Sequence, residues 1–172
     1  MVGTALAASC GYRGVDAHGP TEAWHVVVTR VSMADALAAD EVASGVRDEL
    51  ARAGVLSPGD GWPRVEVEAL GVDESSVGIV SVGGGPEARA TGVGITARAW
   101  LRRAADRPME RDTGDCRAEV VLSVGAAEGS LDPRWAGARR SAALRAGARR
   151  LGRELARHVE GLPVTTDEAL EP

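Results

Sequence analysis

Side chains that could perform acid–base, metal or phosphate chemistry are few in this sequence, and they are scattered. His18, His25 and His158 share no metal-ligand spacing, so we interpret each as a surface or structural histidine. The glycines at 83–85 and at 92 and 94 lie before and within a predicted strand, whereas a phosphate loop follows a strand and opens a helix. No nucleophile and base are spaced to converge. We therefore predict a protein that is not an enzyme, with no catalytic residue, metal or cofactor.

The strongest local signal surrounds the first cysteine. Residues 7–10 read Ala-Ala-Ser-Cys and resemble a lipobox, the end of a lipoprotein signal peptide, in which the cysteine thiol takes a diacylglycerol. A signal peptide needs a positive n-region and an apolar stretch of about 7–15 residues. Because only nine residues, none of them basic, precede Cys10, we interpret residues 1–9 as the remnant of a longer signal peptide. Cys10 is thus the predicted lipidation site, and its acyl chains would anchor the protein to a membrane.

The second cysteine leaves two alternatives open. If Cys10 is acylated, Cys116 has no disulfide partner; if it is not, a bridge between them is conceivable in an oxidising compartment. Nothing in the sequence approaches 18 consecutive apolar residues, so we predict no membrane-spanning helix.

Charge is distributed unevenly. The net charge is −5, and all 20 cationic residues are arginine. Residues 134–160 hold eight of these arginines and two glutamates, which gives this segment +6 and leaves −11 for the rest of the chain. Because a nucleic-acid-binding domain is usually basic overall, we predict that the protein binds no nucleic acid.

Hydrophobic patterns predict a strand and then a helix in the first half of the chain. Residues 24–31 are rich in β-branched side chains and read as a buried strand. Ser32 and Asp35 resemble a capping box for a helix that ends near Ala53, with Gly54 in left-handed geometry. The apolar stripe expected to face the core consists of Leu37, Val42 or Ala43, Val46, Leu50 and Ala53.

The second half predicts further strands and one long helix. Residues 64–70 alternate cleanly, 77–82 extend this region, and glycines at 83–85 break it. Residues 93–102 and 117–124 alternate as two strands, antiparallel neighbours joined by a polar turn at 105–115. Asp132-Pro133 supplies the start of the last helix. Its apolar stripe comprises Leu144, Ala148, Leu151, Leu155, Val159 and Leu162, and Gly161 and Pro163 stop it.

This order predicts an α+β fold, a two-layer sandwich. Two amphipathic helices would pack on one face of an approximately four-stranded mixed sheet. We divide the chain into the signal-peptide remnant at 1–9, the lipid-anchor cysteine and linker at 10–23, a single α/β domain at 24–163 and a flexible acidic tail at 164–172. Arg98 and Arg102, four apart in one strand, would project from the same face. That face would be open to solvent or a partner.

The layout resembles LptE, the lipopolysaccharide-assembly lipoprotein family. The resemblance rests on Cys10-Gly11-Tyr12-Arg13-Gly14 at the start, and on the order of strand, helix, strands and C-terminal helix that follows. It implies an outer-membrane lipoprotein on the periplasmic face, which plugs a large β-barrel partner, LptD-like, and helps it assemble. It also implies possible contact with lipopolysaccharide through basic residues. From their position near the middle strands, we take Arg89, Arg98 and Arg102 as candidates for that contact.

A second interpretation has the same anchor and another partner. Periplasmic lipoproteins that activate a cell-wall synthase, similar to the LpoB group, and components of secretion channels also join a lipid anchor to a small α/β domain. Their linkers are often long, whereas the linker here is about residues 11–23. The short linker favours a role close to the membrane.

Overall fold

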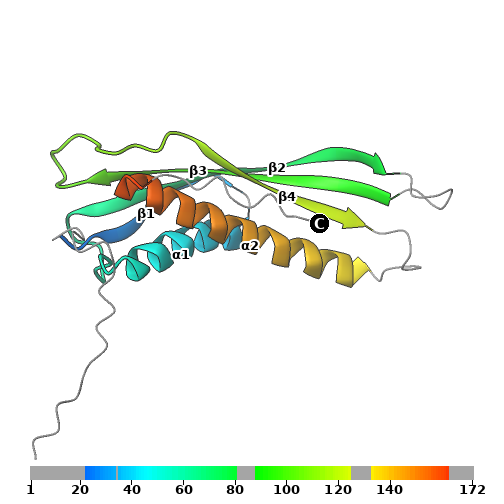
Figure 1. Cartoon of the computed structure of the whole chain (residues 1–172), viewed down its shortest axis with the longest axis horizontal. Coiled ribbons are helices and arrows are strands. Elements are labelled where there is room, and N and C mark those ends of the chain that lie inside the picture. The colour runs from blue at the N-terminus through cyan, green and yellow to red at the C-terminus, as the bar shows by residue number, and fades with distance from the viewer. Residues whose placement is uncertain (1–21, 34, 81–87, 125–132, 163–172) are drawn as a thin grey trace, which may run out of the picture.

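The computed structural model describes residues 22–33, 35–80, 88–124 and 133–162. The elements follow in the order β1 (His25–Val31), α1 (Ala36–Arg52), β2 (Arg64–Val80), β3 (Ala88–Arg102), β4 (Cys116–Val124) and α2 (Pro133–Glu160). Both helices cover the same face of a four-stranded mixed sheet (Figure 1), which confirms the two-layer α+β prediction. The signal-peptide remnant, Cys10, most of the linker and the acidic tail lie outside the described residues.

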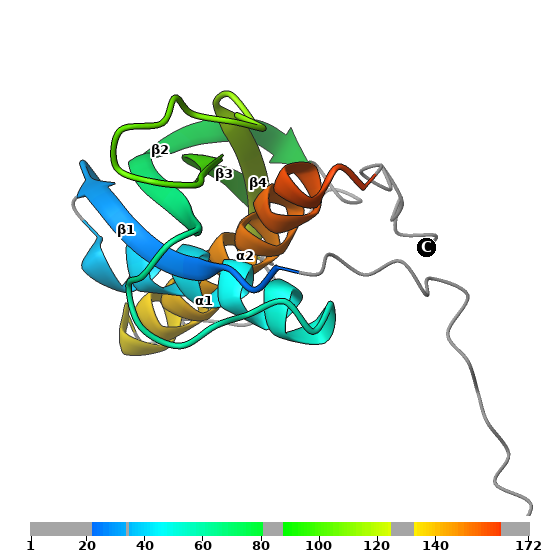
Figure 2. The ribbon, with the colours of Figure 1, turned by 90° about the vertical axis from the view of Figure 1, so that its left-hand side faces the viewer.

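The strands lie in sequence order across the sheet. β1 and β2 are parallel, because α1 returns the chain to the starting edge, and the β2–β3 and β3–β4 pairs are antiparallel. β1 pairs with β2 only from His25 opposite Arg64 to Val31 opposite Ala69, so β2 continues beyond it with β3 as its neighbour. Viewed from its end, the sheet curves over the two helices (Figure 2).

β2 corrects the prediction of two separate segments. It is one strand of 17 residues, with register irregularities between Ala69 and Gly71 and between Ser76 and Gly78. An extra residue in one strand shifts which side chains face the core, so the regular alternation that predicts a strand is lost there. The polar stretch after Gly71 nevertheless pairs residue by residue with β3.

The N-cap of α1 lies three residues later than predicted. Asp35 is the N-cap, and its side chain accepts a hydrogen bond from the Ala38 N–H at 3.1 Å, so the predicted role of Ser32 is wrong. Gly54 has φ +75°, which confirms the left-handed end of the helix. Leu37, placed in the buried stripe by sequence, is 62% exposed, because it lies in the first turn beside an unfilled groove. Ala53 is exposed as well, since it follows the last helical residue.

α2 follows its predicted pattern most closely. It starts at Pro133, and the five stripe positions from Leu144 to Val159 are each at most 2% exposed. Leu162 is 48% exposed and leaves the stripe, because the helix has already ended at Gly161 with φ +79°. No helix within the described ranges has the length and apolarity needed to cross a bilayer.

The two helices touch main chain to main chain. A Cβ atom added to Gly152 would lie 2.1 Å from the carbonyl oxygen of Val42, and one added to Gly45 would lie 2.1 Å from the carbonyl oxygen of Arg149. These glycines therefore set the distance between the helices, and through it the width of the helical layer.

Candidate functional site

The face of the sheet opposite the helices carries an ordered set of charged and aromatic side chains. Along β2 and β3, these side chains alternate with core residues such as Val65 and Leu101. Register pairs Arg64 with Arg102, Glu66 with Trp100 and Glu68 with Arg98. We call this set the polar face: Arg64, Glu66, Glu68, Arg98, Trp100 and Arg102.

Glu66 is the centre of the polar face. It is only 2% exposed, and its carboxylate accepts hydrogen bonds from Arg64 Nη2 at 2.7 Å and Trp100 Nε1 at 2.8 Å. Arg102 Nη2 lies 3.4 Å from the same carboxylate. The Arg64 guanidinium also lies over the Trp62 ring, 3.9 Å from its centroid. The charge of this buried carboxylate is thus balanced by two guanidinium groups, and an indole N–H donates a further hydrogen bond to it.

Arg98 is held by the connection between β3 and β4. Its Nε donates to Asp112 Oδ1 at 2.8 Å, and its Nη2 contacts Asp112 Oδ2 in the bidentate arrangement typical of arginine and carboxylate. The Arg98 guanidinium holds the pKa of the Asp112 carboxyl below its usual range. Thr113 also bonds to the main chain of Ala99, so the segment predicted as a polar turn is fastened to β3.

Two of the three predicted contact residues lie in the polar face. Arg98 and Arg102 project from the same side of β3, as predicted, and each has a carboxylate neighbour. Arg89 lies in β3 opposite Val124, and its side chain is outside the described residues. Burial of the Glu66 carboxylate was not anticipated, because strand alternation alone assigns it to a wet face. Only the register, which places Trp100 and two arginines around the carboxylate, reveals that Glu66 is buried.

Ion pairing extends the polar character of this face to β4. Arg117 Nη2 donates to Asp73 Oδ2 at 2.6 Å, so this ion pair joins β4 to β2 across the intervening strand. The pair crosses β3 at Gly94, where an added Cβ would lie 2.1 Å from Arg117 Nη2. Arg117 lowers the pKa of the Asp73 carboxyl. Gly94 therefore makes room for a side chain, in agreement with its assignment to a strand.

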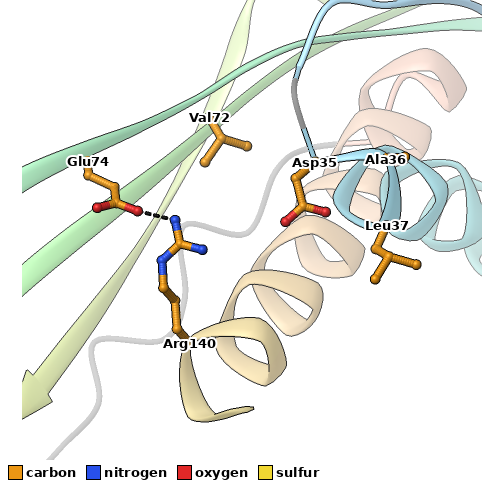
Figure 3. Close-up of a pocket in the computed structure, with 6 residues that line it drawn as sticks. All are labelled: Asp35, Ala36, Leu37, Val72, Glu74 and Arg140. Atoms are coloured by element: carbon orange, nitrogen blue, oxygen red, sulfur yellow. Dashed lines mark hydrogen bonds and ion pairs between the residues drawn. The ribbon is translucent and has the colours of Figure 1, made fainter. Parts of the chain in front are cut away.

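A second surface lies on the helical side, where β1 ends. A groove of about 550 Å³ separates the first turn of α1 from β2 and from α2 (Figure 3). Figure 3 shows Arg140 reaching from α2 to form an ion pair with Glu74. We call this surface the edge groove, lined by Asp35, Ala36, Leu37, Val72, Glu74 and Arg140.

Among the described residues, Cys116 and His158 lie close together but form no recognisable chemical centre. Cys116 is a free thiol 3.8 Å from His158 Nδ1, and burial raises the pKa of that thiol, which disfavours the reactive thiolate. Within the described ranges, no group of three or more His, Cys, Asp or Glu residues could hold a metal ion.

The arginines of α2 are partly neutralised by α1. Arg149 Nε lies 2.9 Å from Asp48 and 3.7 Å from Glu41, and Arg157 Nε donates to the buried Glu49 at 2.7 Å. The basic segment read from the sequence therefore serves partly to join the two helices.

Comparison with known proteins gives similarity of structure only. No protein-family model matches the chain, and no curated protein matches it in sequence. A minor lipoprotein from Acinetobacter baumannii is similar in structure, with a TM-score of 0.47 and 9% identity over 80% of this chain and 92% of that one. Rare lipoprotein B (LptE) from Shewanella oneidensis is similar with a TM-score of 0.40 and 10% identity over 77% of this chain and 92% of that one. A candidate lipoprotein from Caulobacter crescentus is similar with a TM-score of 0.34 and 16% identity over 77% of this chain and 84% of that one.

Proposed function

We propose that this protein is an LptE-like outer-membrane lipoprotein, anchored through Cys10 and facing the periplasm. In this role it plugs a large β-barrel translocon for lipopolysaccharide and helps the barrel to assemble, without catalysing a reaction. The sequence pattern from Cys10 to Gly14 and the order of the elements suggest this role.

The observation that carries the proposal is the polar face. The interior of a wide transmembrane barrel is polar and hydrated, so a plug needs a polar surface whose charges are already balanced. Glu66 with Arg64 and Arg102, Arg98 with Asp112, and Arg117 with Asp73 provide such a surface. Direct contact with lipopolysaccharide phosphates through Arg89, Arg98 or Arg102 belongs to the same proposal.

We expect a C-terminally tagged protein, isolated from native membranes in mild detergent, to bring down one large outer-membrane β-barrel protein in near-equal amount. Mass spectrometry of the eluate identifies the partner and densitometry gives the ratio. Recovery of a cell-wall synthase or a secretion channel in its place would reject the plug and support the second interpretation of the sequence.

We also expect Cys10→Ala to move the protein from the membrane to the soluble fraction, because the acyl chains supply the anchoring free energy, about 0.8 kcal/mol per buried CH₂. The experiment needs an intact signal peptide upstream of Cys10, fractionation by centrifugation and a mass measurement of the lipid. Cys116→Ala is the matched control and should remain membrane-bound. The comparison is repeated in cells that lack the barrel partner, so that the partner cannot hold the protein at the membrane. If the exported, lipid-free Cys10→Ala protein still fractionates with the membrane in these cells, Cys10 is not the anchor.

A further inference from the structure

Past the end of β1, one edge of β2 carries main-chain groups that no strand in the described ranges pairs. The last contact there is the Ser32 N–H, which donates to the Ala69 carbonyl at 2.8 Å. β2 then runs on to Val80 with β3 on its other side. Unpaired N–H and C=O groups along a sheet edge form a template for an added strand.

The hydrogen-bonding pattern between β2 and β3 identifies which residues of β2 direct their main-chain groups toward this open edge. Leu101 exchanges two hydrogen bonds with Glu110 on the side of β3 away from β2. The register of β3 is continuous, so alternate residues counted from Leu101 point away from β2 and the residues between them bond to β2. Gly94 is one of the residues that bond to β2, and its register partner is Asp73. The residues on either side, Val72 and Glu74, therefore direct their N–H and C=O groups to the open edge.

The edge groove runs beside these same two residues. Val72 and Glu74 form one wall, and the first turn of α1 forms another, where Leu37 is 62% exposed (Figure 3). An added strand would hydrogen-bond to β2 and turn alternate side chains into the groove, toward Val72 and Leu37. Main-chain groups and a lateral apolar pocket are the two features that strand addition uses for affinity and specificity.

We infer that the open edge of β2 from Gly71 to Ser76, together with the edge groove, binds an extended segment of a different protein that carries basic side chains. This inference does not depend on which envelope protein the chain serves. Three carboxylates border the segment, Asp35, Asp73 and Glu74, against the two guanidinium groups of Arg117 and Arg140. The local charge is negative, so arginine or lysine in the added strand would complement it.

The same charges disfavour a second copy of this chain as the occupant. Antiparallel pairing of the segment 71–76 with itself about its middle places either Asp73 opposite the Asp73 of the second copy or Glu74 opposite its Glu74, because directly opposed residues share one face of the sheet. Like charges directly opposite each other in a sheet are destabilising. The irregularities at Ala69/Gly71 and Ser76/Gly78 bound the regular segment and limit other registers.

The test uses a synthetic probe, the peptide acetyl-Thr-Val-Arg-Val-Arg-Thr-amide, titrated into the ¹⁵N-labelled full chain. We expect the amide signals of Val72 and Glu74 to shift and their hydrogen exchange to slow. Glu74→Pro should weaken binding by about tenfold or more, because it removes an N–H from the open edge, where proline is tolerated. Glu74→Ala is the matched control: it loses the same carboxylate, keeps the N–H and should bind more tightly than Glu74→Pro.

A second peptide, N-methylated at alternate residues, has the same charge but cannot form the ladder, and it should bind more weakly than the first. Equal binding of the two peptides, equal binding to the two Glu74 variants, shifts confined to other surfaces, or no binding at all would each overturn the inference. Sedimentation of the protein alone as a dimer that Glu74→Pro dissociates would also overturn it, since the occupant would then be a second copy.

Discussion

Gly152→Ala is expected to lower the free energy of unfolding by about 3 kcal/mol or more, at the upper end of overpacking effects in protein interiors. The added methyl would meet the Val42 carbonyl oxygen at 2.1 Å and the Val46 nitrogen at 2.9 Å. Both are main-chain atoms of a helix, which cannot rotate aside, so α1 and α2 must separate. Separation would also loosen Leu151 and Leu155, which are completely buried. Urea denaturation followed by circular dichroism measures the loss.

Gly137→Ala is the control for this experiment. Gly137 lies in α2 as well, but an added Cβ would have nothing within 4 Å. Alanine is the better helix former, so this variant should be more stable than the parent by up to about 1 kcal/mol. Opposite signs for the same substitution in one helix would isolate the contact with α1. If Gly152→Ala is as stable as the parent, the close approach of the helices is incorrect.

Glu66→Ala is expected to lower the free energy of unfolding by about 3–5 kcal/mol, the range for removing one partner of a buried ion pair. The substitution leaves the Trp100 Nε1–H without its acceptor and leaves Arg64 and Arg102 facing each other without the carboxylate between them. Because Trp100 is 6% exposed, water can reach this indole only if the site opens. Urea denaturation gives the loss, and tryptophan fluorescence of the folded variant reports any opening around Trp100.

Glu68→Ala provides the comparison on the same strand and face. Glu68 adds longer-range attraction to Arg98, whose closer partner is Asp112, so its removal should change stability by less than about 0.5 kcal/mol. Similar losses for the two glutamates would indicate that net charge on the polar face, and not the buried site around Glu66, determines stability.

The sequence predicts those parts of the fold whose signals are local. The apolar spacing from Leu144 to Val159 depends on one helix alone, and it was predicted correctly up to the residue where Gly161 ends the helix. The alternation in β3 and β4 likewise predicted two antiparallel strands. β2 was divided wrongly, because its register irregularities break the alternation that identifies a strand.

The candidate surfaces depend on contacts between distant residues, which a pattern cannot supply. Arg98 and Arg102 were placed correctly on one face, but their partners Asp112 and Glu66 follow only from the register and from the course of the β3–β4 connection. Gly152 gives no local signal, since its function depends on Val42, more than a hundred residues earlier. The edge groove exists because β1 is shorter than β2, and only the structure shows that difference.

The contact between the helices also determines when the domain can fold during synthesis. α1 packs chiefly against α2, and its buried residues Val42, Val46 and Leu50 precede Gly152 by about a hundred positions. Until α2 has emerged, this apolar stripe lacks its main cover, and closing so long a loop costs entropy that only the finished contact offsets. A ribosome that releases the chain from its N-terminus therefore presents an incomplete domain until α2 has emerged. Until α2 is released, the nascent domain is expected to stay unfolded and to expose the apolar stripe of α1.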